Sequence, residues 1–215
     1  MGATNPPKSC PGVPTYEELA AGQRVFRVHH VRHLANAMNA TPQPVLGSGG
    51  RFDCLNGSYA YTYLGGSTGA AIAETLCRDL PLDGSPRLIP ASAIHALVLT
   101  ELTVTAPLRT LQLHGPGLSQ VGQDTWLTKS LPRDYILTRH WAQTIRSWAP
   151  KAGGFAYRCR TDEDEMAWVL FTGPGVATHP ALDPVPERSV PLDSPAGRIL
   201  LRTALRTYNA VLSRD

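Results

Sequence analysis

The sequence predicts a single α+β domain, with a compact mixed sheet at its core and helices on its flanks. Its 215 residues, 42% of them apolar and 17% charged, suit one folded domain. Segments with the two-residue period of strands and segments with the helical period both occur along the chain. These segments do not alternate as regular βαβ units, which disfavours a doubly wound parallel sheet.

Periodicity, caps and turn residues predict the individual elements. Alternating or β-rich segments predict strands over residues 24–30, 59–64, 94–105, 108–113, 155–158 and 167–171. Capping residues and apolar stripes predict a short helix at the capping box of residues 15–18, a helix from 67 or 68 to about 80, and helices over 138–148 and 195–212. Residues 42–50, which end in GSGG, and the Pro-rich residues 174–195 are expected to be loops, the second a long surface loop.

These elements divide the chain into three segments. Residues 1–19 are expected to form a polar, Pro-rich tail and the short helix. Residues 20–172 hold the predicted domain. Residues 173–215 hold the Pro-rich loop and a C-terminal helix, which we expect to pack on the same domain.

Charge and cysteine content disfavour several classes of protein. The net charge is only +3, and the arginines are scattered rather than gathered in a stripe, so a small anionic substrate fits as well as a polymer does, and no direct nucleic-acid binding is expected. The four cysteines form no CxxC pair, and His29, His30 and His33 have no partner ligand at a suitable spacing, so no metal site is expected. The sequence shows neither a signal peptide nor a run of ~18 apolar residues, so we expect a cytoplasmic protein without a membrane span.

A turn of sequence GGST follows the strand predicted at residues 59–64. Ser67 or Thr68 would cap the next helix, and a helix N-terminus favours phosphate. The turn matches neither the P-loop nor the Rossmann pattern, so an ordinary tight strand-to-helix turn is the favoured interpretation.

Glu74 lies in this helix among small and apolar residues. On a helical wheel it shares one side with Ala70, Cys77 and Arg78. The carboxylate is either held in a site or paired with Arg78 at the surface, where such a pair contributes about 0.3–0.5 kcal/mol. The pattern alone leaves both interpretations open.

Two cations and a row of tyrosines are further candidates. Arg27 and Arg51 are isolated in apolar or Gly-rich surroundings, as phosphate clamps are, although ordinary surface arginines fit as well. The tyrosines that share one strand face form either core packing or an aromatic wall for a base or a nicotinamide ring; they are Tyr59, Tyr61 and Tyr63.

Three other features have simpler explanations. Cys159 could pair with a remote histidine as a nucleophile, but an inert buried thiol is the favoured interpretation. Residues 162–165 (DEDE) are expected to form a solvated acidic turn. The arginines at four-residue spacing on the last helix are either its wet face or a partner-docking stripe; they are Arg198, Arg202 and Arg206.

Across roughly residues 20–172 the chain resembles the RES-domain family, which is named for an Arg, a Glu and a Ser. The family's first Arg lies on a strand, as Arg27 does in VFRV, and its second lies in a Gly-Arg-aromatic step, as Arg51 does. A strand ending in Tyr then leads to a small-residue helix with Glu, as Tyr63 and Glu74 do. In the later Gly-aromatic strand, Cys159 stands where the family has Ser, and a thiol is the poorer hydrogen-bonding group.

The resemblance implies an ADP-ribosyltransferase-like fold and a toxin that degrades NAD+ by cleaving its nicotinamide–ribose bond, by hydrolysis or phosphorolysis. NAD+ would be the substrate, with no metal. The implied catalytic residues are Glu74, Arg27 and Tyr63. The implied NAD+-binding residues are Arg27, Arg51, Tyr63, Ser67 and Cys159, with the two arginines gripping the pyrophosphate.

Family members are usually neutralised by an antitoxin that carries a DNA-binding helix-turn-helix, so such a partner is expected, and a homodimer stays open. Two alternative functions remain. One is a protein mono-ADP-ribosyltransferase that uses NAD+. The other is a catalytically weak NAD-binding protein, which Cys159 at the Ser position suggests.

Overall fold

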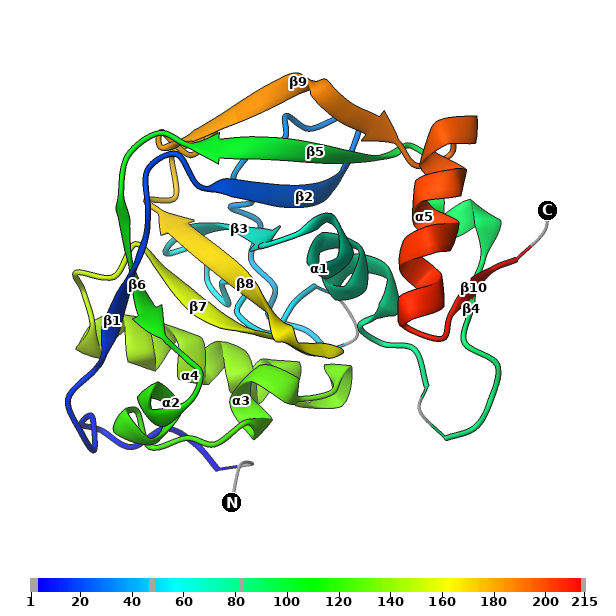
Figure 1. Cartoon of the computed structure of the whole chain (residues 1–215). Coiled ribbons are helices and arrows are strands. Elements are labelled where there is room, and N and C mark those ends of the chain that lie inside the picture. The colour runs from blue at the N-terminus through cyan, green and yellow to red at the C-terminus, as the bar shows by residue number, and fades with distance from the viewer. Residues whose placement is uncertain (1–3, 47–48, 82, 214–215) are drawn as a thin grey trace.

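A computed structural model describes residues 4–46, 49–81 and 83–213. One curled eight-stranded sheet forms its centre (Figure 1), in the strand order β1-β6-β7-β8-β3-β2-β5-β9. The strands of this sheet are β1 (Tyr16–Leu19), β2 (Arg24–His30), β3 (Ala60–Gly65), β5 (Leu97–Val104), β6 (Leu108–Gln112), β7 (Gly154–Cys159), β8 (Asp162–Thr172) and β9 (Leu182–Pro191). Neighbouring strands are antiparallel except β6 and β7, which are parallel. The predicted α+β class with a mixed sheet is therefore confirmed.

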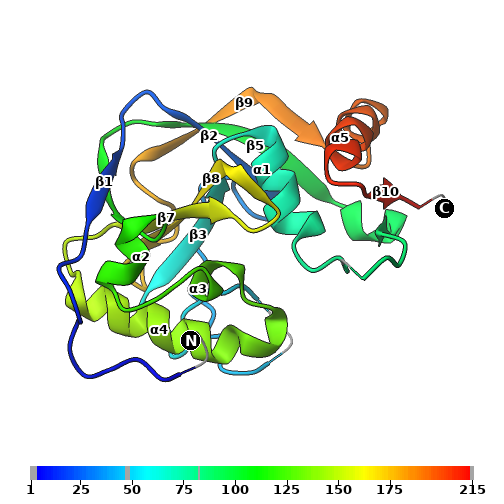
Figure 2. The same cartoon turned by 60° about the horizontal axis from the view of Figure 1, so that its bottom comes forward.

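Helices cover the sheet on two sides (Figures 1 and 2). The α-helices are α1 (Thr68–Ile72), α2 (Pro116–Gln120), α3 (Trp126–Lys129), α4 (Tyr135–Trp148) and α5 (Pro195–Thr207). The shorter turns are the π-helical η1 (Ala73–Cys77) and the 3₁₀ turns η2 (Ala91–Ile94) and η3 (Pro132–Asp134). Helices α2, α3 and α4 gather on one side, α1 and α5 on the other, and a small parallel pair joins β4 (Leu88–Ile89) to β10 (Val211–Leu212).

Three apolar clusters explain why the sheet curls. In the first, Trp141 and Ile145 of α4 pack against strand residues such as Phe155. In the second, α1 and α5 pack against β5. The third draws on strands from both ends of the sheet, including Leu19 of β1 and Leu182 of β9. Because burying apolar surface is the main favourable term in folding, the sheet closes around this third cluster.

Three predictions about the chain ends were wrong. The capping box at residues 15–18 begins no helix, because this segment pairs with β6 as β1, with Glu17 opposite Thr110. The Pro-rich segment is not all loop, because residues 182–191 form β9 beside β5. Strand β9 lies at the edge of the sheet, where prolines are tolerated. The last helix ends at Thr207 rather than at residue 212. Asn209 adopts a φ of 49°, a left-handed conformation that commonly follows helix ends.

Two other predicted segments also differ from the structure. The acidic residues 162–165 are not a turn but begin β8, and the turn before them is formed by Arg160 and Thr161. The helix expected to reach residue 80 ends its π-helical part at Cys77. Residues 47 and 48 of the expected GSGG loop, and residues 1–3 of the expected tail, lie outside the described residues.

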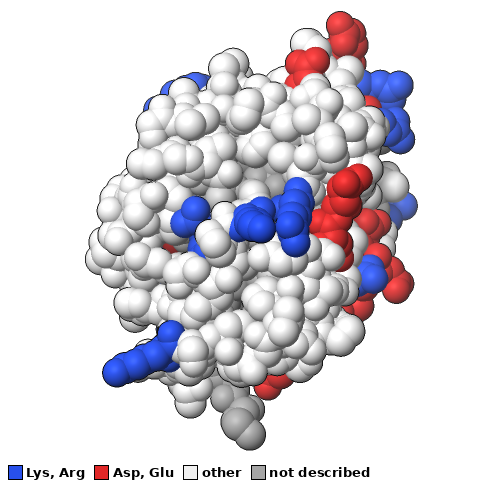
Figure 3. Space-filling view, turned by 90° about the vertical axis from the view of Figure 1, so that its left-hand side faces the viewer, with Lys and Arg blue, Asp and Glu red and all other residues white. Residues whose placement is uncertain are grey.

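Surface charge is dispersed on the face that Figure 3 presents. Lys and Arg appear there as separate groups among uncharged residues, and Asp and Glu gather toward one side. Every helix in the described ranges is too short or too polar to cross a bilayer.

Gly65, at the junction of β3 and α1, provides a test of this packing. A Cβ at this position would overlap backbone atoms of Ala70 and Ala71 in the first turns of the helix. We expect Gly65→Ala to lower the free energy of unfolding in urea by about 1–3 kcal/mol. The control is Gly173→Ala, whose Cβ would meet no atom within 4 Å and should change that free energy by less than about 0.5 kcal/mol. Equal stabilities for the two variants would contradict the packing of α1 on β3.

Candidate active site

Glu74 is positioned by a short helix that changes its winding. Ser67 caps α1, because its Oγ accepts a hydrogen bond from Ala70 N at 3.0 Å. The helix then widens into the π-helical turn η1, whose first turn holds Glu74. Such π-helical segments occur frequently at functional sites. The hydroxyl of Ser67, predicted to bind NAD+, is used for this cap, and Ser67 is not among the residues that line the pocket described below.

Three N–H or O–H donors hold the Glu74 carboxylate. Its Oε2 lies 2.7 Å from Arg51 Nη2 and accepts a hydrogen bond from the Tyr157 hydroxyl at 3.3 Å. Its Oε1 accepts one from Arg160 N at 2.6 Å. Burial by itself raises the pKa of Glu74, but the Arg51 guanidinium and the Arg160 N–H lower it by more, so the net pKa lies below the ordinary value. Glu74 is therefore an anchored, ionised carboxylate.

Arg51 forms its ion pair with this carboxylate from a buried position. Only 2% of its side chain is exposed, and its guanidinium lies 5.6 Å from the centre of the Tyr157 ring. Its Nε and Nη1 are buried with no hydrogen-bond partner among the described residues. The surface pair between Glu74 and Arg78, weighed as an alternative from the sequence, is not formed, because Arg78 pairs with Asp79.

Cys159 lies beside Glu74 but outside the pocket lining. Its side chain is buried and hydrogen bonds with Glu74. Burial, followed by the charge of Glu74, raises the pKa of Cys159 to about 12. A thiol with such a pKa is protonated near neutral pH and is a poor nucleophile, which favours the inert interpretation of Cys159.

Tyr63 uses its hydroxyl within the protein. The hydroxyl donates to Asp53 Oδ1 at 2.7 Å and accepts from Phe52 N at 2.9 Å. Burial and the neighbouring Asp53 raise the pKa of Tyr63 well above its ordinary value. Gly50 N donates to the other oxygen of Asp53 at 2.7 Å. Since the hydroxyl is engaged on both sides, the ring is the part of Tyr63 left for a ligand.

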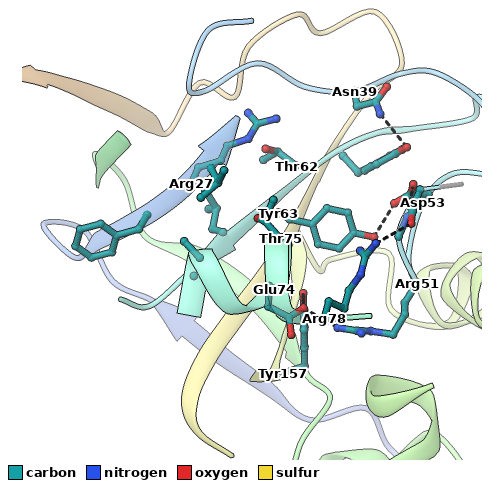
Figure 4. Close-up of a pocket in the computed structure, with 18 residues that line it drawn as sticks. Arg27, Asn39, Arg51, Asp53, Thr62, Tyr63, Glu74, Thr75, Arg78 and Tyr157 are labelled. Atoms are coloured by element: carbon teal, nitrogen blue, oxygen red, sulfur yellow. Dashed lines mark hydrogen bonds and ion pairs between the residues drawn. The ribbon is translucent and has the colours of Figure 1, made fainter. Parts of the chain in front are cut away.

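Arg27 lies at the other end of the site, across Tyr63 from Glu74 (Figure 4). Its Nη1 donates to the carbonyl oxygens of Ala35 at 2.8 Å and Ala37 at 2.6 Å. Burial lowers the pKa of Arg27 to about 10. Within the described ranges, no carboxylate forms an ion pair with this cation.

These groups surround a pocket of about 340 Å³, within the range of small-ligand sites. It is lined by Phe26, Arg27, Val28, Asn39, Gly49, Gly50, Arg51, Asp53, Tyr61, Thr62, Tyr63, Leu64, Gly65, Ala71, Glu74, Thr75, Arg78 and Tyr157. The four candidates Arg27, Arg51, Tyr63 and Glu74 are thus brought together. Tyr59 instead packs in the core.

Several residues of the site escaped the sequence analysis. Asp53 follows Arg51 by two positions and looks like an ordinary loop residue, while Tyr157 looks like a buried strand residue. The N–H of Arg160 is a backbone group that no side-chain pattern can reveal. Elsewhere, His29 Nε2 is bonded to Thr100 Oγ1 at 2.9 Å, and the described residues hold no cluster of three or more side chains suited to a metal.

The Tyr63 hydroxyl gives a first test of this geometry. Tyr63→Phe removes both of its hydrogen bonds and leaves buried Asp53 with one partner fewer, so we expect the free energy of unfolding to fall by about 1–3 kcal/mol. Tyr16→Phe is the matched control, because no hydrogen bond of the Tyr16 hydroxyl is seen among the described residues. Urea denaturation measures both, and a Tyr63→Phe protein as stable as wild type would contradict the assigned bonds.

The lowered pKa of Glu74 gives a second test, in the dependence of stability on pH. A carboxylate whose pKa is lower in the folded state stabilises the fold above its unfolded pKa of about 4.3 and loses that effect as the pH falls through the folded pKa. At pH 7, Glu74→Gln leaves Arg51 buried without its counter-charge and should lower the free energy of unfolding by about 3–5 kcal/mol. The difference from wild type should shrink below about pH 4.3.

The control for this series is Glu163→Gln, since the Glu163 side chain is 71% exposed. Its effect should stay below about 0.5 kcal/mol at every pH. A Glu74→Gln effect that is the same at pH 7 and at pH 3 would contradict an ionised, paired Glu74.

Comparison with known proteins assigns the family. In fold, this chain is similar to a chain in the crystal structure of the M. tuberculosis MbcT–MbcA toxin–antitoxin complex, with a TM-score of 0.57, 18% sequence identity, and coverage of 86% of this chain and 92% of that chain. No curated protein sequence matches this chain. The model of the RES domain matches residues 24–193, a range that contains every candidate site residue and extends through β9. The chain therefore belongs to the RES domain family.

Proposed function

We propose that this protein cleaves the nicotinamide–ribose bond of NAD+. The observation that carries the proposal is the ionised Glu74 carboxylate, which is fixed by Arg51, Arg160 N and Tyr157 at one end of the pocket. The bond breaks with its electron pair leaving on the nicotinamide nitrogen, so positive charge develops on the ribose. A fixed anion placed beside that charge stabilises the transition state without having to reorganise.

The partners of Glu74 leave it able to bind substrate. A carboxylate oxygen can accept more than one hydrogen bond, and Oε1 of Glu74 accepts one from Arg160 N. Oε1 can therefore also accept a ribose hydroxyl or the hydroxyl of an incoming nucleophile. The ring of Tyr63, whose hydroxyl is engaged elsewhere, offers a surface on which the nicotinamide or the ribose packs.

The two predicted phosphate clamps take different roles in this proposal. Arg51 holds Glu74 and is almost fully buried, so we assign it to the carboxylate rather than to the pyrophosphate. Arg27 is a partly buried cation without a carboxylate partner among the described residues, and burial without a counter-charge disfavours its charged form. The pyrophosphate of NAD+ would supply the missing negative charge through charge-assisted hydrogen bonds.

We further propose that the protein is a cytoplasmic toxin with a protein antitoxin that carries a helix-turn-helix. Support comes from the RES family membership and from the structural neighbour, which belongs to a toxin–antitoxin complex. In this view the loss of NAD+ is the toxic event. Growth arrest that is equally strong with Glu74→Gln would contradict the link between toxicity and cleavage.

The direct test measures free nicotinamide after the pure protein is incubated with NAD+. We expect release by wild type and by Glu163→Gln, and a loss of at least about 100-fold in Glu74→Gln, because one positioned charged group typically contributes 10²–10⁴-fold. Glu74→Asp, which keeps the charge but draws it back from the pocket, should fold and also be slow. All assays run at a temperature at which circular dichroism shows each variant folded.

Two outcomes would refute the assignment. One is a wild-type protein that releases no nicotinamide from NAD+. The other is a folded Glu74→Gln protein whose rate lies within about threefold of wild type, because a loss that small is below what removal of a catalytic carboxylate produces.

A further inference from the structure

We propose that Arg78 binds a phosphate group of the substrate, so that the pocket selects phosphate-bearing nicotinamide nucleotides over nicotinamide riboside. This inference rests on the proposed cleavage of NAD+ and adds a binding residue to it. Arg78 lies one helical turn after Glu74 and lines the same pocket. In Figure 4, Arg78 gathers with Glu74, Arg51 and Tyr157 at the end of the pocket opposite Arg27.

Arg78 is more accessible to a ligand than Arg51. The Arg78 side chain is 24% exposed, whereas that of Arg51 is 2% exposed and bound to Glu74. A ligand entering the pocket can therefore reach the Arg78 guanidinium without breaking the pair that fixes the carboxylate. Arg78 is thus the cation at the Glu74 end that remains available.

The Arg78 guanidinium is also held in place. It lies 5.5 Å from the centre of the Tyr135 ring, and its Nε and Nη2 donate to Asp79 Oδ2 at 3.2 and 3.1 Å. Nη2 also donates to the Gly49 carbonyl at 3.3 Å. No described residue accepts a hydrogen bond from Nη1. A planar guanidinium fixed along one edge, with donors left on the other, is well suited to a phosphate, because little side-chain freedom is lost on binding.

The charges around Arg78 do not balance. Two neighbouring groups of ion pairs lie here: Arg51 pairs with Glu74 at 2.7 Å, and Asp79 pairs with Arg78 at 3.1 Å and with Arg160 at 3.3 Å. Together these pairs hold three guanidinium groups and two carboxylates, so they carry one positive charge in excess. One phosphate of the NAD+ pyrophosphate would neutralise that charge at Arg78, and the other phosphate would be left for Arg27.

The test compares substrates with and without phosphate on matched variants. For Arg78→Gln we expect kcat/KM for NAD+ to fall by about 10- to 100-fold, mainly through KM, because a charged hydrogen bond is lost. The same value for nicotinamide riboside, which has no phosphate, should be unchanged. Arg78→Lys should recover part of the loss, and Arg202→Gln, an exposed arginine on α5, should behave as wild type.

A binding measurement keeps this proposal separate from the cleavage reaction. By calorimetry, Arg78→Gln should weaken the affinity for ADP-ribose, which carries the pyrophosphate, by a similar factor, whether or not the protein cleaves NAD+. Failure of wild type to release nicotinamide would thus refute the proposed function alone. Unchanged ADP-ribose affinity, or equal losses on NAD+ and nicotinamide riboside, would overturn the role of Arg78 as a phosphate ligand and leave it a support of Glu74.

Discussion

The ion pair between Arg51 and Glu74 is the interaction on which the rest of the site depends. A carboxylate in so enclosed a position is unfavourable unless it is paired and hydrogen-bonded, and this one receives Arg51 from the loop before β3, Arg160 N from the β7–β8 turn and Tyr157 from β7. Two segments distant in the sequence, the loop before β3 and β7 with the turn after it, therefore converge on one functional group. The curled sheet is what brings them together, since β8 pairs with both β3 and β7.

The glycines before Arg51 make this convergence sterically feasible. A Cβ at Gly50 would collide with the Tyr63 hydroxyl, and one at Gly49 would collide with Asp53. The loop therefore approaches β3 closely, and the bond from Tyr63 to Asp53 keeps it there. The contacts between Tyr63 and Asp53 therefore position the loop that carries Arg51.

The sequence predicted which residues share the pocket better than it predicted their partners. Local context marked Arg27, Arg51, Tyr63 and Glu74 as candidates beside plainer interpretations, and their match in order to the RES family selected them. No local pattern encodes tertiary distances. The sequence therefore did not predict that Arg51 binds Glu74 or that the Tyr63 hydroxyl bonds within the protein. The same reason explains the wrong predictions for β1 and β9. A capping box predicted a helix at β1 and several prolines predicted a loop at β9, but pairing with β6 and β5 makes both segments strands.

The central claim is that this pocket breaks the bond between nicotinamide and ribose rather than another bond of NAD+. Phosphorus and proton NMR spectra of NAD+ incubated with the protein test it most directly, because they identify the bond that is cut. The account predicts that free nicotinamide appears while the pyrophosphate signals persist in an ADP-ribose product. Release of AMP or of nicotinamide mononucleotide, which requires cleavage of the pyrophosphate, would contradict it.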